Sequence, residues 1–180
     1  MRITGGSLKG RRVEVPGGTI RPSMDRMRES VFAVLGDLSG SSFLDLFSGT
    51  GVIALEAASR GASYVEAVEM DRPKREALLK NVSISPVRVN CRFMAVELYV
   101  RRARRSFDCV FCDPPFPYRY KWNLVRDIAA SPLVKNGSLI LLHRPREDFF
   151  ETGIPFIQKE QVKEYGRSVV EFLRVCKIFA

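Results

Sequence analysis

From residue 42 onward the chain alternates short apolar runs with longer amphipathic segments, and this alternation constrains the fold more than any other feature. Runs such as 139–142 are apolar throughout, which is typical of strands covered on both faces of a parallel sheet. The expected strands are 43–47, 64–69, 87–93, 107–112 and 138–143, and the expected helices are 52–60, 73–83, 96–104 and 122–130. Two further strands, 155–161 and 168–179, have no helix between them. The pattern predicts a doubly wound α/β domain, mostly parallel, with an antiparallel C-terminal edge strand.

The first 40 residues differ from this alternating region. Five glycines fall within residues 1–18, among extended stretches such as 9–15, and this pattern is typical of a small β-hairpin. A helix is expected from about residue 24 to 35, with Ser23 as its N-cap and Gly36 near its end. We therefore expect two parts: a basic hairpin and helix in residues 1–40, packed on the core, and one domain in residues 41–180.

Positive charge is the strongest signal in the composition. The chain has 29 lysines and arginines against 20 aspartates and glutamates, and its formal net charge is +9. Residues 101–105 hold four arginines, and residues 1–30 carry seven basic side chains against three acidic ones. Because guanidinium groups match phosphate geometry, we expect a nucleic acid partner. The plainer alternative is a solvated basic surface without such a partner.

Neither a membrane segment nor a metal site is predicted. No apolar run reaches the roughly 18 residues of a membrane span, and the first residues lack the apolar stretch of a signal peptide, so a cytoplasmic protein is expected. Cys109 and Cys112 have a spacing seen in zinc sites, but within a strand they face opposite sides of the sheet. The chain contains one histidine, and its cysteines are interpreted as core residues of a reducing compartment.

A glycine turn joins the first expected strand to the helix at 52–60. Gly49 and Gly51 let a ligand approach the backbone, and the helix behind them begins with free N–H groups. The next strand ends at Glu69, where a carboxylate can accept both hydroxyl hydrogens of a ribose. Such a turn suits NAD as well as S-adenosylmethionine. Asp45 could pair with an ammonium group and Phe47 replaces a small residue, and both features favour S-adenosylmethionine.

The strand at 107–112 is followed by the run Asp113-Pro114-Pro115-Phe116. This run ends the strand at the sheet edge where ligands bind in such folds. The Asp113 carboxylate and the Pro114 carbonyl can each accept one N–H of a planar exocyclic amine, which holds the nitrogen towards a methyl donor. Phe116 offers a stacking face for a base taken out of its helix. The run therefore predicts methyl transfer to a nucleobase amine.

Aromatic and basic residues alternate directly after this run, in 117–122. Arg119 and Lys121 suit contact with the phosphates of unpaired RNA, and the neighbouring tyrosines could stack on its bases. The aromatic rings of this segment could equally fold back onto the core. His143 ends a strand at the same edge and could line the site, although a single histidine is more often structural.

Five features, in this order, resemble the bacterial RsmD family of 16S ribosomal RNA guanine-N2 methyltransferases. They are Arg2-Ile3-x-Gly5-Gly6 with Gly10-Arg11, Arg21-Pro22 with Asp25-Arg26-x-Arg28-Glu29, the turn at 45–51, Glu69-Met70-Asp71, and the run at 113–116. The resemblance implies a class I, Rossmann-like methyltransferase that uses S-adenosylmethionine. It implies methyl transfer to N2 of one guanine in 16S rRNA, within a small ribosomal subunit or an assembly intermediate. It also implies that residues 5–12 and 21–28 grip the RNA.

One position departs from the family pattern. After the third strand such proteins commonly carry Asp or Asn, which hydrogen-bonds the adenine amine, whereas Met94 holds that place here. A thioether is a weak acceptor, and a lost hydrogen bond costs about 0.5–1.5 kcal/mol of cofactor binding. The predicted catalytic residues are Asp113, Pro114 and Phe116. The predicted cofactor-binding residues are Asp45, Phe47, Gly49, Gly51, Glu69, Met70, Met94 and Ala95, and the predicted RNA-binding residues are Arg11, Arg21, Arg26, Arg28, Arg119 and Lys121.

Three other functions fit parts of the sequence. Adenine N6 is also a planar exocyclic amine, so N6-methylation of adenine in RNA or DNA is the nearest alternative. A non-catalytic RNA-binding assembly factor on a retired methyltransferase fold is favoured only by Met94. An NAD-dependent oxidoreductase would leave Asp45 and the run at 113–116 without a role. The protein is expected to act as a monomer.

Overall fold

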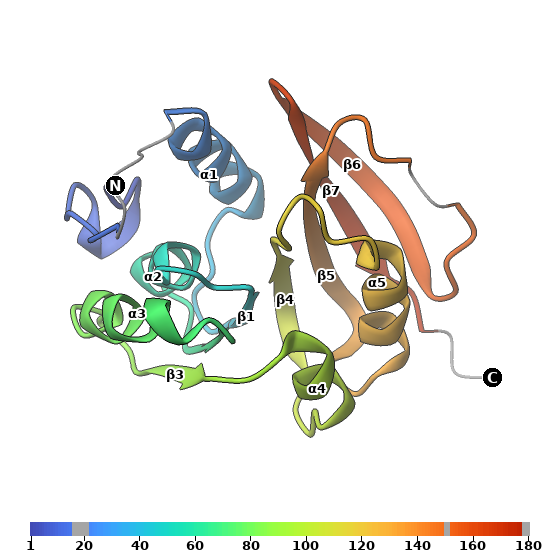
Figure 1. Ribbon diagram of the computed structural model, residues 1–180, viewed down its shortest axis with the longest axis horizontal. Helices are drawn as coiled ribbons and strands as arrows, with labels where there is room; N and C mark the ends of the chain where they lie inside the picture. Colours follow the sequence, from blue (N-terminus) through green and yellow to red (C-terminus); the bar gives the residue numbers. More distant parts are fainter. Residues whose placement is uncertain (16–21, 150–151, 178–180) are drawn as a thin grey trace.

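The computed structural model describes residues 1–15, 22–149 and 152–177, and these form a seven-stranded sheet with helices on both faces (Figure 1). The strands are β1 (Ser42–Leu46), β2 (Tyr64–Val68), β3 (Val89–Arg92), β4 (Phe107–Cys112), β5 (Val134–Pro145), β6 (Ile157–Tyr165) and β7 (Ser168–Val175). The helices are α1 (Pro22–Leu35), α2 (Val52–Ser59), α3 (Arg75–Val82), α4 (Val96–Arg101) and α5 (Lys121–Ala130), with 3-10 turns η1 (Gly6–Leu8) and η2 (Arg72–Lys74).

The order of strands across the sheet is β3-β2-β1-β4-β5-β7-β6. Strands β1 to β5 are parallel, and β7 pairs antiparallel with both β5 and β6. The predicted fold class is thereby confirmed. The sequence did not predict that β7 lies inside the sheet and β6 forms the edge. The burial of the two strands explains this order, because β7 is buried along most of its length and β6 is mostly exposed.

Two hydrophobic clusters cover the two faces of the sheet. One cluster contains residues of α1, α2 and α3, and the other contains residues of α4 and α5 (Figure 1). Cys109 belongs to the first cluster and Cys112 to the second, so the prediction that their side chains face opposite sides of β4 is confirmed. Within the described residues there is no His, Cys, Asp and Glu cluster that could hold a metal ion. No described helix is long and apolar enough to cross a membrane.

The first 15 residues fold back on themselves beside α2. Arg2 and Arg12 form an isolated antiparallel bridge, and the N–H of Ile3 donates to the Arg11 carbonyl at 2.9 Å. The side chains of Ile3 and Val13 are buried in the same cluster as α1 and α2. This segment is therefore hairpin-like, as predicted, and two of its apolar side chains lie in the core.

Helix α1 begins earlier than predicted. It starts at Pro22, so Ser23 lies within the first turn and is not the N-cap. Proline is favoured at the first position of a helix, because its missing N–H needs no partner there.

Candidate active site

Three strands, β1, β2 and β4, end in register at one edge of the sheet, beside β5, which continues to Pro145. Leu46 of β1 pairs with Val68 of β2 and with Cys112 of β4. Cys112 in turn pairs with Leu142 of β5. Each of these four paired residues is followed by a residue that lines one cavity of about 1610 Å³. In order across the sheet, the lining residues are Glu69, Phe47, Asp113 and His143. Parallel pairing thus brings residues from distant parts of the sequence to one site at the carboxyl edge, where ligands bind in doubly wound sheets.

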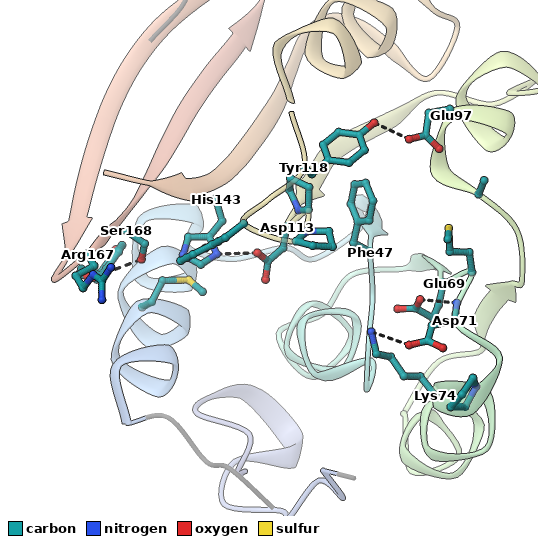
Figure 2. Close-up of a pocket in the computed structure, with 18 of the residues that line it drawn as sticks. Phe47, Glu69, Asp71, Lys74, Glu97, Asp113, Tyr118, His143, Arg167 and Ser168 are labelled. Carbon is teal, nitrogen blue, oxygen red and sulfur yellow. Dashed lines mark hydrogen bonds and ion pairs between the residues drawn. The ribbon is translucent and has the colours of Figure 1, made fainter. Parts of the chain in front are cut away.

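The cavity extends from this row in two directions (Figure 2). Figure 2 shows Glu69, Asp71 and Lys74 on one side of Asp113, and Arg167 and Ser168 on the other. The first half is also lined by Met70, Arg72, Pro73, Ala95 and Glu97, and the second by Met27, Glu147, Tyr165 and Gly166. Asp113 lies where the two halves meet. The site therefore has room for two ligands that meet at this carboxylate.

Glu69 is fixed by backbone donors in the first half. Its Oε2 accepts the N–H of Gly49 at 2.7 Å and its Oε1 accepts the N–H of Asp71 at 2.8 Å. The residue is 5% exposed. Each carboxylate oxygen can accept a second hydrogen bond, so both remain able to bind hydroxyl groups of a ligand. Met70, which is 65% exposed, adds an apolar surface to the same half.

Phe47 has a strained backbone beside the cavity. Its φ of 62° lies in the left-handed region, which costs a phenylalanine about 1–3 kcal/mol. The Phe47 ring contacts the ring of Tyr118 edge-on at 5.6 Å, and the Tyr118 hydroxyl donates to Glu97 at 2.5 Å. Burial raises the pKa of Tyr118. Tyr118 thus packs inward, whereas Tyr120 is 65% exposed. In the segment after the Asp-Pro-Pro-Phe run, one tyrosine therefore packs against the core and the other lies at the surface.

The two glycines of the turn are not among the residues that line the cavity. Gly51 precedes α2 with φ 79°, and a Cβ atom there would lie 2.5 Å from the Leu78 side chain. Gly49, with φ 55°, offers its N–H to Glu69. Gly51 is thus required by backbone conformation and by packing against α3.

Asp45 lies beneath the turn and is 1% exposed, so its predicted contact with a cofactor ammonium group is not available in this structure. Its Oδ2 accepts the hydroxyl hydrogen of Ser48 at 2.7 Å and the N–H of Ala54 at 3.2 Å. Burial, together with the nearby Asp113 and Glu69 carboxylates, raises the pKa of Asp45 to about 7. The carboxyl group therefore fastens the turn to the start of α2.

Asp113 and Phe116 form the centre of the cavity together with His143. The Asp113 Oδ1 lies 2.7 Å from the Nδ1 of His143. The rings of Phe116 and His143 meet edge-on, with centroids 5.7 Å apart. Phe116 is 43% exposed, so its ring is accessible to a ligand. Pro114 and Pro115 also line the cavity.

The predicted contact of Lys121 with RNA requires a side chain at the surface. The structure shows that Lys121 is buried. Its side chain is 6% exposed, and its Nζ donates to the Phe116 carbonyl at 2.8 Å and pairs with Asp148 at 2.7 Å. The amphipathic lysine side chain fills the space behind the loop and its charge is neutralised there. Lys121 therefore holds the loop of the Asp-Pro-Pro-Phe run in place.

Arg28 is also buried, and its predicted contact with RNA is wrong for the same reason. Its side chain is 2% exposed and pairs with Glu56 and Asp25. Two residues before it on α1, Arg26 is exposed, and so are Arg11 and Arg119. Arg21 lies outside the described residues.

Ala95, which directly precedes α4, lines the cavity, and its contact with a cofactor stays a prediction. Met94 is not among the lining residues and packs against the cluster of α4 and α5. Sequence reasoning missed the second half of the cavity, which is built by Met27 and the turn at 165–168. Gly166 between two expected strands was the only signal of that turn, and nothing in the sequence placed it beside α1.

These features define the class of protein. The strand order of the sheet is that of a Rossmann-like, class I methyltransferase. The same class has a glycine turn after β1, an acid after β2 and an Asp-Pro-Pro-Phe type of run after β4. The family described as Conserved hypothetical protein 95 matches residues 1–174, and the chain belongs to this family, which confirms the resemblance to RsmD proteins.

Named relatives agree with this membership. The chain is 35% identical over 122 residues to ribosomal RNA small subunit methyltransferase D of Escherichia coli, a match that spans 64% of this chain and 60% of the relative. It is 29% identical over 155 residues to the putative rRNA methyltransferase YlbH of Bacillus subtilis, covering 82% and 84% of the two chains. Among solved structures, the putative methyltransferase yhhF of Escherichia coli superposes with a TM-score of 0.88 at 26% identity, covering 98% of both chains.

Proposed function

We propose that this protein transfers a methyl group from S-adenosylmethionine to the exocyclic N2 of a guanine in 16S ribosomal RNA. The observation that carries the proposal is the position of Asp113 between the two halves of the cavity, with an aromatic ring of the same run beside it. The relatives whose names specify the small-subunit ribosomal RNA support RNA as the substrate.

The first half of the cavity fits S-adenosylmethionine. The buried Glu69 carboxylate, held by two backbone N–H groups, is suited to bind the ribose hydroxyls. Met70 and Ala95 offer apolar surface to the adenine, and Figure 2 shows Phe47 between Glu69 and Asp113. When bound, S-adenosylmethionine would supply a methyl group whose carbon a nitrogen lone pair can attack, with the positively charged sulfur leaving as a neutral thioether.

Asp113 holds the amine that receives the methyl group. An exocyclic amine is a poor nucleophile because its lone pair is delocalised into the ring. The carboxylate accepts one N–H, the Pro114 carbonyl accepts the other, and the nitrogen is thereby oriented and favoured in its tetrahedral form. Phe116 stacks against the base, which must be taken out of its helix to enter.

We assign RNA binding to arginines that are exposed in the structure. Arg11 on the hairpin-like segment, Arg26 on α1 and Arg119 after the catalytic run are exposed and suit phosphate contact. We therefore assign residues 1–40 as an RNA-binding extension and residues 41–180 as the methyltransferase domain. A small ribosomal subunit or assembly intermediate as substrate, a contact from Arg21, a cytoplasmic location and a monomeric state stay predictions.

The test is to incubate the protein with methyl-labelled S-adenosylmethionine and small ribosomal subunits that lack the modification. The RNA is then digested and the labelled nucleoside is identified. N2-methylguanosine is the expected product. N6-methyladenosine would keep the chemistry and overturn the guanine assignment, and no label with intact subunits and with free 16S rRNA would contradict the proposed activity.

A further inference from the structure

One side chain contacts both groups that face the substrate amine and its base. His143, within β5 and near its carboxyl end, places its Nδ1 2.7 Å from the Asp113 Oδ1 (Figure 2), and its ring lies edge-on to the Phe116 ring. It is 5% exposed. The in-register pairing of β4 with β5 causes this contact, because Cys112 and Leu142, which precede the two residues, are direct partners.

The environments of the two ring nitrogens identify the tautomer of His143. The Nε2 atom is buried and has no hydrogen-bond partner among the residues that the structure describes. A proton on Nε2 would be a buried donor without an acceptor, which costs about 1–3 kcal/mol. An unprotonated Nε2 lacks a partner as well, so the contact of the other nitrogen decides the tautomer. Only a proton on Nδ1 gives the Asp113 Oδ1, 2.7 Å away, a donor in place of a second acceptor.

We propose that His143 is a positioning residue for methyl transfer, which fixes the Asp113 carboxylate and the Phe116 ring in the orientation that receives the base. This inference rests on the proposed function. The torsion that rotates a carboxylate is soft, so an unrestrained Asp113 would present either oxygen in many directions. With Oδ1 accepting from His143, Oδ2 keeps both of its acceptor positions for the substrate amine.

The backbone of the loop does not depend on His143. The Nζ of Lys121 donates to the Phe116 carbonyl at 2.8 Å and is paired with Asp148, and neither contact involves His143. Removal of the imidazole should therefore free the two side chains while the loop stays in place. This separates a role in positioning from a role in folding.

Two variants of His143 test the proposal. His143→Asn keeps an N–H donor near the place of Nδ1, and His143→Leu fills similar space without a donor. We expect His143→Leu to lower kcat by about 100-fold, as an error of about 1 Å in placement does, with the Kd for S-adenosylmethionine unchanged. His143→Asn should recover most of the lost turnover. Full activity of His143→Leu, or an equal loss in both variants, would overturn the proposal.

A second readout needs no substrate. His143 is the one histidine of the chain, so a sample with 15N-labelled histidine gives the signals of a single ring. We expect the neutral tautomer with a protonated Nδ1, and a shift of the tautomer equilibrium in Asp113→Ala. Protonation on Nε2 would overturn the inferred hydrogen bond. If the unmodified protein methylates no RNA, the proposed function fails, and the role of His143 in methyl transfer fails with it. The spectrum tests the hydrogen bond between His143 and Asp113 independently of that result.

Discussion

The Nε of Arg28 lies 2.9 Å from the Oε1 of Glu56, and both side chains are almost completely buried. The same Glu56 oxygen accepts the backbone N–H of Thr4 at 2.6 Å and its hydroxyl hydrogen at 2.9 Å. The Nη2 of Arg28 donates to the Arg2 carbonyl at 2.6 Å and pairs with Asp25. This one pair therefore joins the hairpin-like segment, α1 and α2.

Arg28→Ala is expected to destabilise the protein by about 3–5 kcal/mol, because it leaves the buried Glu56 carboxylate without its main partner. Arg26→Ala, two residues away on the exposed side of the same helix, is the matched control and should change stability by no more than about 0.5 kcal/mol. Urea unfolding measures both. Equal stability of the two variants would show that the buried pair does not hold the segment.

The same two positions separate folding from RNA binding. Arg26→Ala should weaken RNA binding and reduce the slope of log affinity against log salt by about 1, since one phosphate contact is lost. The measurement is a binding titration with a 16S rRNA fragment at several salt concentrations. An unchanged slope would remove Arg26 from the RNA interface.

Arg28 and Lys121 show where sequence reasoning reaches its limit. The strand and helix pattern follows from local periodicity, and the acids that end β2 and β4 follow from the edge of a parallel sheet where ligands bind. The residues that bury a charge are set by partners far along the chain, such as Glu56 for Arg28 and Asp148 for Lys121. The sequence alone therefore predicts that a basic side chain in a basic segment is exposed, unless its buried acidic partner is known.

Asp45 and His143 show the same limit at the site itself. Both residue types are chemically suited to bind a ligand, and their positions beside the turn and at the strand end were visible in the sequence. Their hydrogen-bond partners, Ser48 and Ala54 for Asp45 and Asp113 for His143, depend on the depth of each side chain in the fold. The sequence therefore predicted where the site lies in the fold. It did not predict which contacts each side chain makes there.

Glu69→Ala is expected to weaken S-adenosylmethionine binding by about 10- to 100-fold, since hydrogen bonds to a charged group contribute about 1.5–3 kcal/mol. Glu69→Gln is the matched variant, because it keeps the shape and one acceptor oxygen and should lose less affinity. Isothermal titration calorimetry compares the three proteins. Cofactor affinity in Glu69→Ala equal to that of the unmodified protein would place the ribose elsewhere.

The buried carboxyl group of Asp45 predicts a dependence of stability on pH. Its pKa is about 7 in the folded protein and about 3.9 in an unfolded chain, so the folded state binds the proton more tightly. The stability that this adds is complete below about pH 4 and is lost as the pH rises to about 7. Asp45→Asn does not titrate and removes this dependence.

Urea unfolding at a series of pH values from 4.5 to about 8 tests this point. The free energy of unfolding of the unmodified protein, minus that of Asp45→Asn, should decrease through this range and become constant above it. Other titrating groups are common to both proteins and cancel. Parallel pH profiles would show that Asp45 keeps an ordinary pKa in the fold.

The central claim is that Asp113 holds the acceptor amine and does not bind the methyl donor. The most direct measurement is turnover and S-adenosylmethionine affinity of Asp113→Ala on the same preparation, with Asp127→Ala, an exposed carboxylate of α5, as the control. We predict that Asp113→Ala lowers kcat by about 10²–10³-fold or more, the size of effect when a group that stabilises the transition state is removed, while the cofactor Kd stays within a factor of about three. Turnover close to that of Asp127→Ala would contradict the mechanism.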